Sequence, residues 1–286
     1  MHYSVLHAES LEYLALDPAG TYVDATAGLG GHTRLIAERL TTGKLYACDR
    51  DAESLAMARQ NTAEFADRIE FVQSSFSTLK RSLESLGVPK VHGLLADLGV
   101  SRYQLTDPER GFSFMAEGPI DMRMDRSQPT TAGDLVNYQS EKDLADLIYQ
   151  LGEERRARRI ARAIVRARPI RSTAHLAQVI EAAVPRTGRL HPATQTFMAL
   201  RLAVNDEPGE LDALLEQGPE LIQPGGRLVV ISFMSLEDRK VKQRFQALAR
   251  GGKATVLTKH VVVPSEAEVR ENPASRSAKL RALEMR

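Results

Sequence analysis

The stretch Asp24-Ala-Thr-Ala-Gly28-Leu-Gly30-Gly31-His32 follows a short apolar segment and precedes a helical pattern. Glycines in such a turn let the backbone approach a ligand where a Cβ would clash. The helix that follows directs free N–H groups and the positive end of its dipole at the turn. About twenty residues later, Asp49 ends a second apolar segment, where a carboxylate can bind a ribose diol. The stretch therefore predicts a nucleoside-cofactor site on a Rossmann-like sheet.

Short apolar segments alternate with amphipathic ones on both sides of a long interruption, which favours a mainly parallel sheet with helices on its two faces. The predicted strands are Thr21–Ala25, Lys44–Asp49, Ile69–Gln73, His92–Asp97, Arg227–Ser232, Ala254–Lys259 and Ser277–Glu284. The predicted helices are His32–Leu40, Ala52–Glu64, Phe76–Leu86, Glu210–Ile222 and Leu236–Ala249, and the last two flank a predicted turn at Pro224-Gly225-Gly226.

The strand–helix alternation stops after the fourth strand and gives way to loop and helix signals only. We therefore predict an α/β domain over 1–100 and 193–286, interrupted by a helical insertion over 101–192. Two sequential domains are the alternative, but they would leave an incomplete four-stranded sheet ending at Asp97.

Composition and charge exclude several classes of protein. A net charge of +1 gives no overall sign of nucleic-acid binding, so any such sign must be local. The single cysteine, Cys48, fits a reducing compartment, and neither a signal peptide nor a membrane-spanning apolar run is present, so we expect a cytoplasmic protein without a membrane partner. The scattered histidines and the absence of Cys-x-x-Cys predict no metal site.

Polar and aromatic residues at the predicted strand ends are candidates for the site. Because ligands lie at the carboxyl ends of parallel strands, we expect Asp97 to face the same crevice as the glycine turn. Phe76 follows the third strand, where an apolar ring can pack on an adenine. Ser235 begins a helix after the strand Arg227–Ser232 and would face the same crevice.

A second local signal lies in the insertion, over Glu153–Arg168. At ~100° per residue, the arginines at 155, 159, 162 and 166 share one helix face, and Ala157, Ile160, Ala161 and Ile164 share the other. Arginine forks bind phosphates bidentately, so the stripe is a candidate contact for RNA or DNA. A solvated face paired with acidic residues is the alternative.

Several long motifs, in order along nearly the whole chain, resemble the bacterial ribosomal RNA small subunit methyltransferase H family, the MraW family. They are Asp24-x-Thr-x-Gly28-x-Gly30-Gly31-His32, Asp97-Leu98-Gly99-Val100-Ser101, Arg110-Gly111-Phe112-Ser113-Phe114, Asp121-Met122-Arg123-Met124, His191-Pro192-Ala193-Thr194, Ser235-Leu236-Glu237-Asp238-Arg239 and Arg276-Ser277-Ala278-Lys279-Leu280-Arg281 after Asn272-Pro273. Two departures are Met198 and Met234, which replace a glutamine and a histidine of the family's pattern.

The resemblance implies a class I methyltransferase fold and methyl transfer from S-adenosylmethionine to the exocyclic N4 of a cytosine in the decoding region of 16S ribosomal RNA. It also implies that the helical insertion helps to hold the RNA, as free 16S RNA or as the small ribosomal subunit. The cofactor contacts that it implies are Gly30, Gly31, His32, Asp49, Phe76, Asp97 and Gln104, to which the turn itself adds Asp24 and Gly28.

The transfer needs a group that accepts the proton of the cytosine amine, and Asp97 is the first candidate, ahead of Asn205 and Ser235. The two methionines keep open a cofactor-sensing RNA-binding protein without transfer activity. An amino-methyltransferase acting on DNA is a further alternative, and a nicotinamide dehydrogenase is the least favoured. The sequence leaves open whether the chain forms a homodimer.

Overall fold

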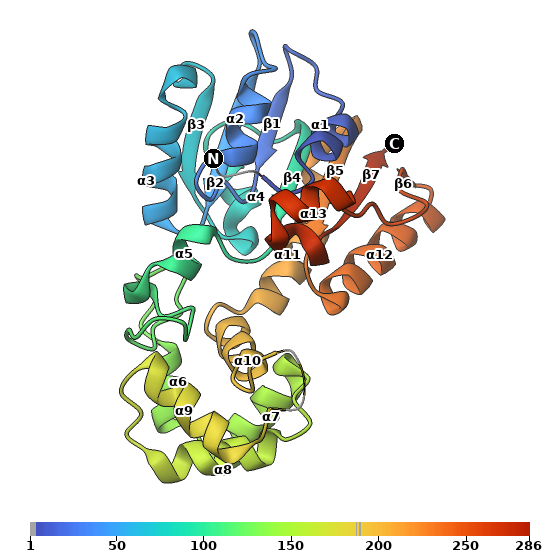
Figure 1. The fold of residues 1–286 in the computed structure, drawn as a ribbon. Helices are drawn as coiled ribbons and strands as arrows, with labels where there is room; N and C mark the ends of the chain where they lie inside the picture. The colour runs from blue at the N-terminus through green and yellow to red at the C-terminus, as the bar shows by residue number, and fades with distance from the viewer. Residues whose placement is uncertain (1–3, 187, 189) are drawn as a thin grey trace. The chain divides into compact units, whose positions relative to one another are not determined.

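Two compact units make up the structure, a computed structural model that describes residues 4–186, 188 and 190–286 (Figure 1). One unit joins the chain up to Gly99 to Pro208–Arg286, and the other is Val100–Glu207. The chain thus leaves the first unit after its fourth strand and returns to it later.

The first unit is built on a seven-stranded sheet with strand order β3-β2-β1-β4-β5-β7-β6. Its strands are β1 (Thr21–Asp24), β2 (Lys44–Asp49), β3 (Ile69–Gln73), β4 (Val91–Asp97), β5 (Ile222–Ser232), β6 (Ala254–Val256) and β7 (Lys279–Met285). β7 runs antiparallel to both of its neighbours, and the pairs formed by β1 to β5 are parallel. The predicted Rossmann-like, mainly parallel sheet is confirmed.

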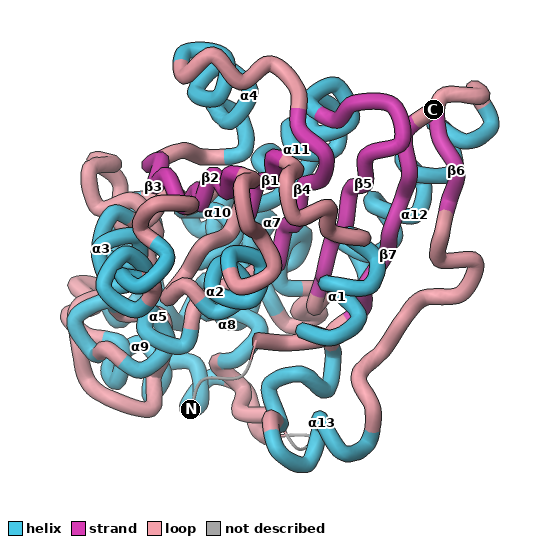
Figure 2. Tube along the Cα trace, turned by 90° about the horizontal axis from the view of Figure 1, so that it is seen from above, coloured by secondary structure: helices cyan, strands magenta, loops and turns pink. Residues whose placement is uncertain are grey.

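Helices cover both faces of this sheet (Figure 2). Neighbouring strand residues point to opposite faces, so in β4 Leu94 packs in the cluster with α4, α11 and α12, and Leu95 packs with α1, α2 and α3. The helices of this unit are α1 (His7–Leu14), α2 (Gly31–Ala37), α3 (Ala52–Asn61), α4 (Phe76–Ser85), α11 (Glu207–Leu221), α12 (Ser235–Arg250) and α13 (Glu266–Glu271). The patterns at α1 and α13 were not recognised as helices in the sequence.

The predicted strands all exist, but two regions differ. The predicted turn 224–226 lies inside β5, where the register shifts opposite Val91 and Gly93, and Gly225 adopts a φ of 80°. The strand predicted over Ala254–Lys259 ends at Val256, because the Thr258 hydroxyl, in place of a backbone carbonyl, accepts the N–H of Ala282.

The described part of the second unit contains helices and loops and no strand of the sheet. Its helices are α5 (Arg102–Thr106), α6 (Ala132–Tyr138), α7 (Glu141–Gly152), α8 (Ala157–Ala167), α9 (Thr173–Ala183) and α10 (Thr194–Val204). The predicted boundary after 192 was wrong, since α10 buries Phe197 and Leu200 in the core of this unit and the boundary falls after Glu207.

No helix among the described residues is long and apolar enough to cross a membrane.

Candidate cofactor and catalytic site

Three aspartates end three parallel strands at one edge of the sheet in the first unit. Asp24 ends β1, Asp49 ends β2 and Asp97 ends β4, and β1 lies between the other two strands. Because parallel strands finish at the same edge, the carboxylates lie around the glycine turn that follows β1. This arrangement matches the crevice predicted from the sequence.

The glycine turn requires glycine for two separate reasons. Gly28 and Gly30 adopt φ values of 51° and 91°, which L residues with a Cβ rarely adopt. A Cβ on Gly31 would overlap the Ser4 hydroxyl. In α2 the first intrahelical bond is from Arg34 N to Gly30 O, so the N–H groups of its first turn make no intrahelical bond and are directed toward the glycine turn.

Asp49 is tied to this turn. Its Oδ2 accepts the N–H of Gly28 at 2.8 Å and its Oδ1 accepts the N–H of Asp51 at 2.9 Å. Burial raises the pKa of Asp49 to about 6, which the two hydrogen bonds partly oppose. Each carboxylate oxygen has a second lone pair, so Asp49 can hold the turn and still accept a ribose hydroxyl.

Asp24 supports the glycine turn through hydrogen bonds. It is fully buried, and its oxygens accept the Thr33 hydroxyl at 2.7 Å and the N–H of Thr26 at 3.2 Å. The Thr26 hydroxyl in turn accepts the N–H of Asp97 at 2.7 Å. Asp24 therefore positions the turn and has no exposed surface, and its predicted contact with a cofactor stays a prediction.

Asp97 differs from the other two aspartates in its hydrogen bonding. Its Oδ1 is buried and finds no hydrogen-bond partner among the described residues, although the side chain as a whole is 24% exposed. Burial, followed by the negative charges of Asp24 and Glu237, raises the pKa of Asp97 to about 8. A buried acceptor without a donor is costly, and a ligand N–H would satisfy it.

His32 faces Asp97 from the second residue of α2. Its Nδ1 lies 3.7 Å from Asp97 Oδ2, and its Nε2 lies 3.1 Å from the carbonyl oxygen of Val5. His32 as a whole is 5% exposed, and its predicted cofactor contact stays a prediction.

Two further candidates lie at the same edge. Phe76 is the first residue of α4 and packs partly against the core, with part of its ring exposed. Ser235 is the exposed first residue of α12, and its hydroxyl accepts Lys279 Nζ at 3.3 Å. Met234 lies half-buried just before Ser235, and its N–H donates to Glu237 Oε2 at 3.1 Å. The roles of Phe76 and Ser235 stay predictions.

Gln104 and Asn205 belong to the second unit, and both have local partners. Gln104 Oε1 accepts the N–H of Ser101 in a capping box at the start of α5. Asn205 is 1% exposed; its Oδ1 accepts Met124 N at 2.7 Å and its Nδ2 donates to Met122 O at 2.7 Å. Asn205 thus holds the loop of the Asp121–Met124 motif, and its role as a proton acceptor stays a prediction that these contacts do not favour.

The arginine helix in the second unit is α8, and it begins later than predicted. Glu154 binds the backbone N–H and side chain of Arg156, so a turn precedes α8 and Arg155 lies outside it. The predicted apolar face is confirmed, since Ala157, Ile160, Ala161 and Ile164 are all buried.

The exposed side of α8 is strongly basic. It carries Arg158, Arg159, Arg162 and Arg166, of which Arg162 pairs with Glu141 at 3.3 Å. The other three have no carboxylate partner in the described part of the chain.

Sequence reasoning missed Thr26 and Thr33, which connect Asp24 to the turn and to Asp97. Thr26 stands inside the quoted motif, so its position beside the glycines was the available signal.

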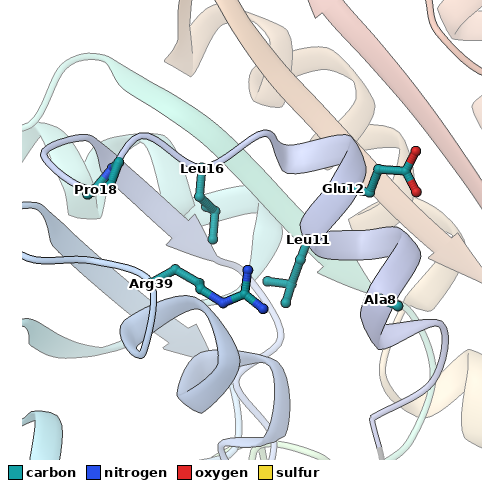
Figure 3. A pocket seen from close by; sticks show the side chains of 6 residues that line it. All are labelled: Ala8, Leu11, Glu12, Leu16, Pro18 and Arg39. Atoms are coloured by element: carbon teal, nitrogen blue, oxygen red, sulfur yellow. The ribbon is translucent and has the colours of Figure 1, made fainter.

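A hollow of about 490 Å³ lies elsewhere, between α1 and the end of α2 (Figure 3), and it is lined by Ala8, Leu11, Glu12, Leu16, Pro18 and Arg39. Within the described ranges, no group of three or more His, Cys, Asp or Glu could hold a metal ion.

Comparison with known proteins places the chain among methylases. All of residues 1–286 match the model of the MraW methylase family. The ribosomal RNA small subunit methyltransferase H of Solibacter usitatus is 68% identical over 286 residues, 100% of both chains. The proteins of the same name from Koribacter versatilis and Rippkaea orientalis are 51% and 47% identical, covering 98% and 99% of this chain and 93% and 92% of theirs.

Proposed function

Since the chain belongs to the MraW methylase family, we propose that it transfers a methyl group from S-adenosylmethionine to the RNA of the small ribosomal subunit. The target that we propose is the exocyclic N4 of a cytosine in the decoding region of 16S RNA. The relatives' names support the RNA of the small subunit, and the motif resemblance supports the base and its position.

The observation that carries this proposal is the unsatisfied Oδ1 of Asp97 at the mouth of the glycine turn. Asp49 and the positive end of the α2 dipole at the glycine turn fit the ribose and carboxylate ends of S-adenosylmethionine. Asp97 then offers a buried acceptor to the amine that reacts, in a place from which water is largely excluded.

S-adenosylmethionine supplies, when bound, an electrophilic methyl group on a sulfonium. The cytosine amine is a weak nucleophile because its lone pair is delocalised into the ring. An N4–carbon bond forms as the carbon–sulfur bond breaks, and N4 loses one proton. The ionised form of Asp97, which the positive charge of a bound sulfonium favours over the protonated form, localises the lone pair by accepting an N–H bond and then takes that proton. The base has to leave its helical stack to reach Asp97, so the RNA target is looped or flipped out.

An Asp97→Asn variant tests this role. We expect kcat at saturating cofactor and RNA to fall by about 10²–10⁴-fold, the range for a positioned general base. Cofactor affinity is measured separately by calorimetry. Full turnover with unchanged cofactor affinity would eliminate Asp97 as the acceptor.

We also propose that the second unit recognises the RNA. The exposed arginines of α8 support this point, because guanidinium groups bind phosphates bidentately and three of the four have no carboxylate partner in the described chain.

Two competing functions have direct tests. A cofactor-sensing RNA-binding protein would bind S-adenosylmethionine and RNA but transfer no methyl group. A DNA amino-methyltransferase would label single-stranded DNA in preference to small ribosomal subunits. Parallel transfer assays on the two substrates, with the same enzyme and labelled cofactor, distinguish these functions from the proposed one.

A further inference from the structure

The first residue of β7 lies at the sheet edge that carries the candidate site. β7 is antiparallel to β5, so Lys279 at its start pairs with Ser232 at the end of β5. Ile231, one residue earlier, pairs with Asp97 across the next strand. Adjacent strands are about 4.8 Å apart, so Lys279 begins roughly 10 Å from Asp97, on the scale of a single nucleotide.

Lys279 has no acidic partner at this edge of the sheet among the described residues. Its Nζ donates to the Ser235 hydroxyl, and no carboxylate lies within 4 Å of it in the described residues. Arg281, which points to the same face of β7 two residues later, is paired with Asp238 at 2.6 Å. The two basic residues therefore differ, since one is neutralised and the other is available.

Further unpaired basic residues extend from Lys279. Arg239 and Lys242 follow Ser235 by four and seven residues, so they lie on the same side of α12, and both are exposed. Arg276 is exposed just before β7. None of the three has an ion-pair partner in the part of the chain that the structure describes.

The two acidic residues that follow Ser235 in α12 are already engaged. Glu237 is 9% exposed, and its Oε2 accepts the N–H groups of Phe233 and Met234. Asp238 pairs with Arg281. The exposed charge around Ser235 is therefore positive although the chain as a whole is almost neutral.

We propose that Lys279, Arg239, Lys242 and Arg276, the β7–α12 basic surface, bind the phosphates that flank the target nucleotide. The inference rests on the proposed function and adds to it a phosphate-binding surface on the first unit itself, separate in sequence from the arginines of α8. Lysine and arginine bind phosphates in a sequence-independent way and release counterions, so this surface holds the RNA in register while the base enters the site.

The test compares the wild type, an Arg239→Ala/Lys279→Ala double variant and Lys253→Ala. Lys253 is an exposed lysine just after α12 and before β6, at the opposite end of both α12 and β7, so it controls for the removal of one surface charge. The dissociation constant is measured over a salt series for a protein-free 16S RNA fragment and for intact small subunits.

For the double variant we expect weaker binding of both ligands, by about 5- to 20-fold, at two- to fivefold per exposed charge. The slope of log affinity against log salt should decrease by about 1.4, or 0.7 for each phosphate that the variant no longer neutralises. Cofactor affinity should match the wild type, and Lys253→Ala should bind as the wild type does.

The proposal is refuted if the double variant keeps the affinity and salt slope of the wild type, or if Lys253→Ala weakens RNA binding equally. It is also refuted if only the binding of intact subunits is weakened, because the surface would then bind a ribosomal protein. Should the double variant not bind cofactor, Arg239→Ala alone carries the test, because this side chain is exposed on a helix. A wild type that transfers no methyl group refutes the proposed function, whereas active wild type with an unaffected double variant refutes only this surface.

Discussion

Replacing Asp97 by asparagine should make the cofactor-free protein more stable while it removes activity. In the native state Asp97 has a pKa of about 8, raised by burial and then by the charges of Asp24 and Glu237. In the unfolded chain the pKa returns to about 3.9. Between these two values the native state retains a proton that the unfolded chain has released, so the free energy of unfolding decreases as pH rises through this window.

The magnitude follows from the same two pKa values. A pH of 7 lies about three units above the pKa in the unfolded chain, and each unit corresponds to 1.36 kcal/mol. The loss of stability at pH 7 is therefore at most about 4 kcal/mol. The side chain is 24% exposed, so water screens part of this penalty and we expect about 2 kcal/mol. Asparagine has the same shape without the charge and should recover that amount, or roughly 4–8 °C in Tm for a domain of this size.

Calorimetric or urea unfolding of the cofactor-free proteins at pH 5 and pH 8.5 measures the effect. The advantage of Asp97→Asn over the wild type should increase by about 2 kcal/mol between these pH values. Asp67→Asn removes an exposed carboxylate, 71% exposed, and should stay within about 0.5 kcal/mol of the wild type at both. A variant that is less stable than the wild type, or an advantage independent of pH, would refute the account of Asp97.

Three further tests, on Gly30, Asn205 and the arginines of α8, have distinct expected results. Gly30→Ala, at a φ of 91° and 3.1 Å from a neighbouring methyl carbon, should destabilise the protein by about 1–3 kcal/mol and weaken cofactor binding. Gly87→Ala, at a φ of 75° in open space, should show the backbone strain alone in thermal unfolding and leave cofactor affinity unchanged. Asn205→Ala should cost about 2 kcal/mol or more in urea unfolding because it leaves buried backbone groups unpaired, and a loss of turnover at unchanged stability would contradict this. Arg159→Ala/Arg166→Ala should raise KM for RNA several-fold with cofactor affinity unchanged, and an unaltered KM would show that α8 does not contact RNA.

The sheet could be predicted from the sequence because its strands are short, buried and separated by strong turn signals. β2 and β3 begin and end at the predicted residues. The limits of β6 could not be predicted, since they depend on the Thr258 hydroxyl, a contact between segments distant in sequence. The end of the insertion was placed too early because the apolar pattern of α10 does not say which core it enters.

The position of the site could be predicted from the sequence, but the contacts of its individual side chains could not. The sequence shows that an aspartate ends each of three strands. It does not show that Asp24 is fully buried and accepts the Thr33 hydroxyl, or that one oxygen of Asp97 has no hydrogen-bond partner among the described residues. In the same way, the polarity of Asn205 indicated chemistry, and only the tertiary contacts show that its amide is used to hold a loop. Hydrogen-bond partners far apart in the sequence decide these roles.

Transfer of labelled methyl from S-adenosylmethionine to small ribosomal subunits from cells that lack this protein, with nucleoside analysis of the RNA, tests the central claim most directly. We predict that the label is recovered as N4-methylcytidine from 16S RNA and is abolished or greatly reduced with Asp97→Asn. Tight cofactor binding without transfer, or label in another nucleoside, would contradict it.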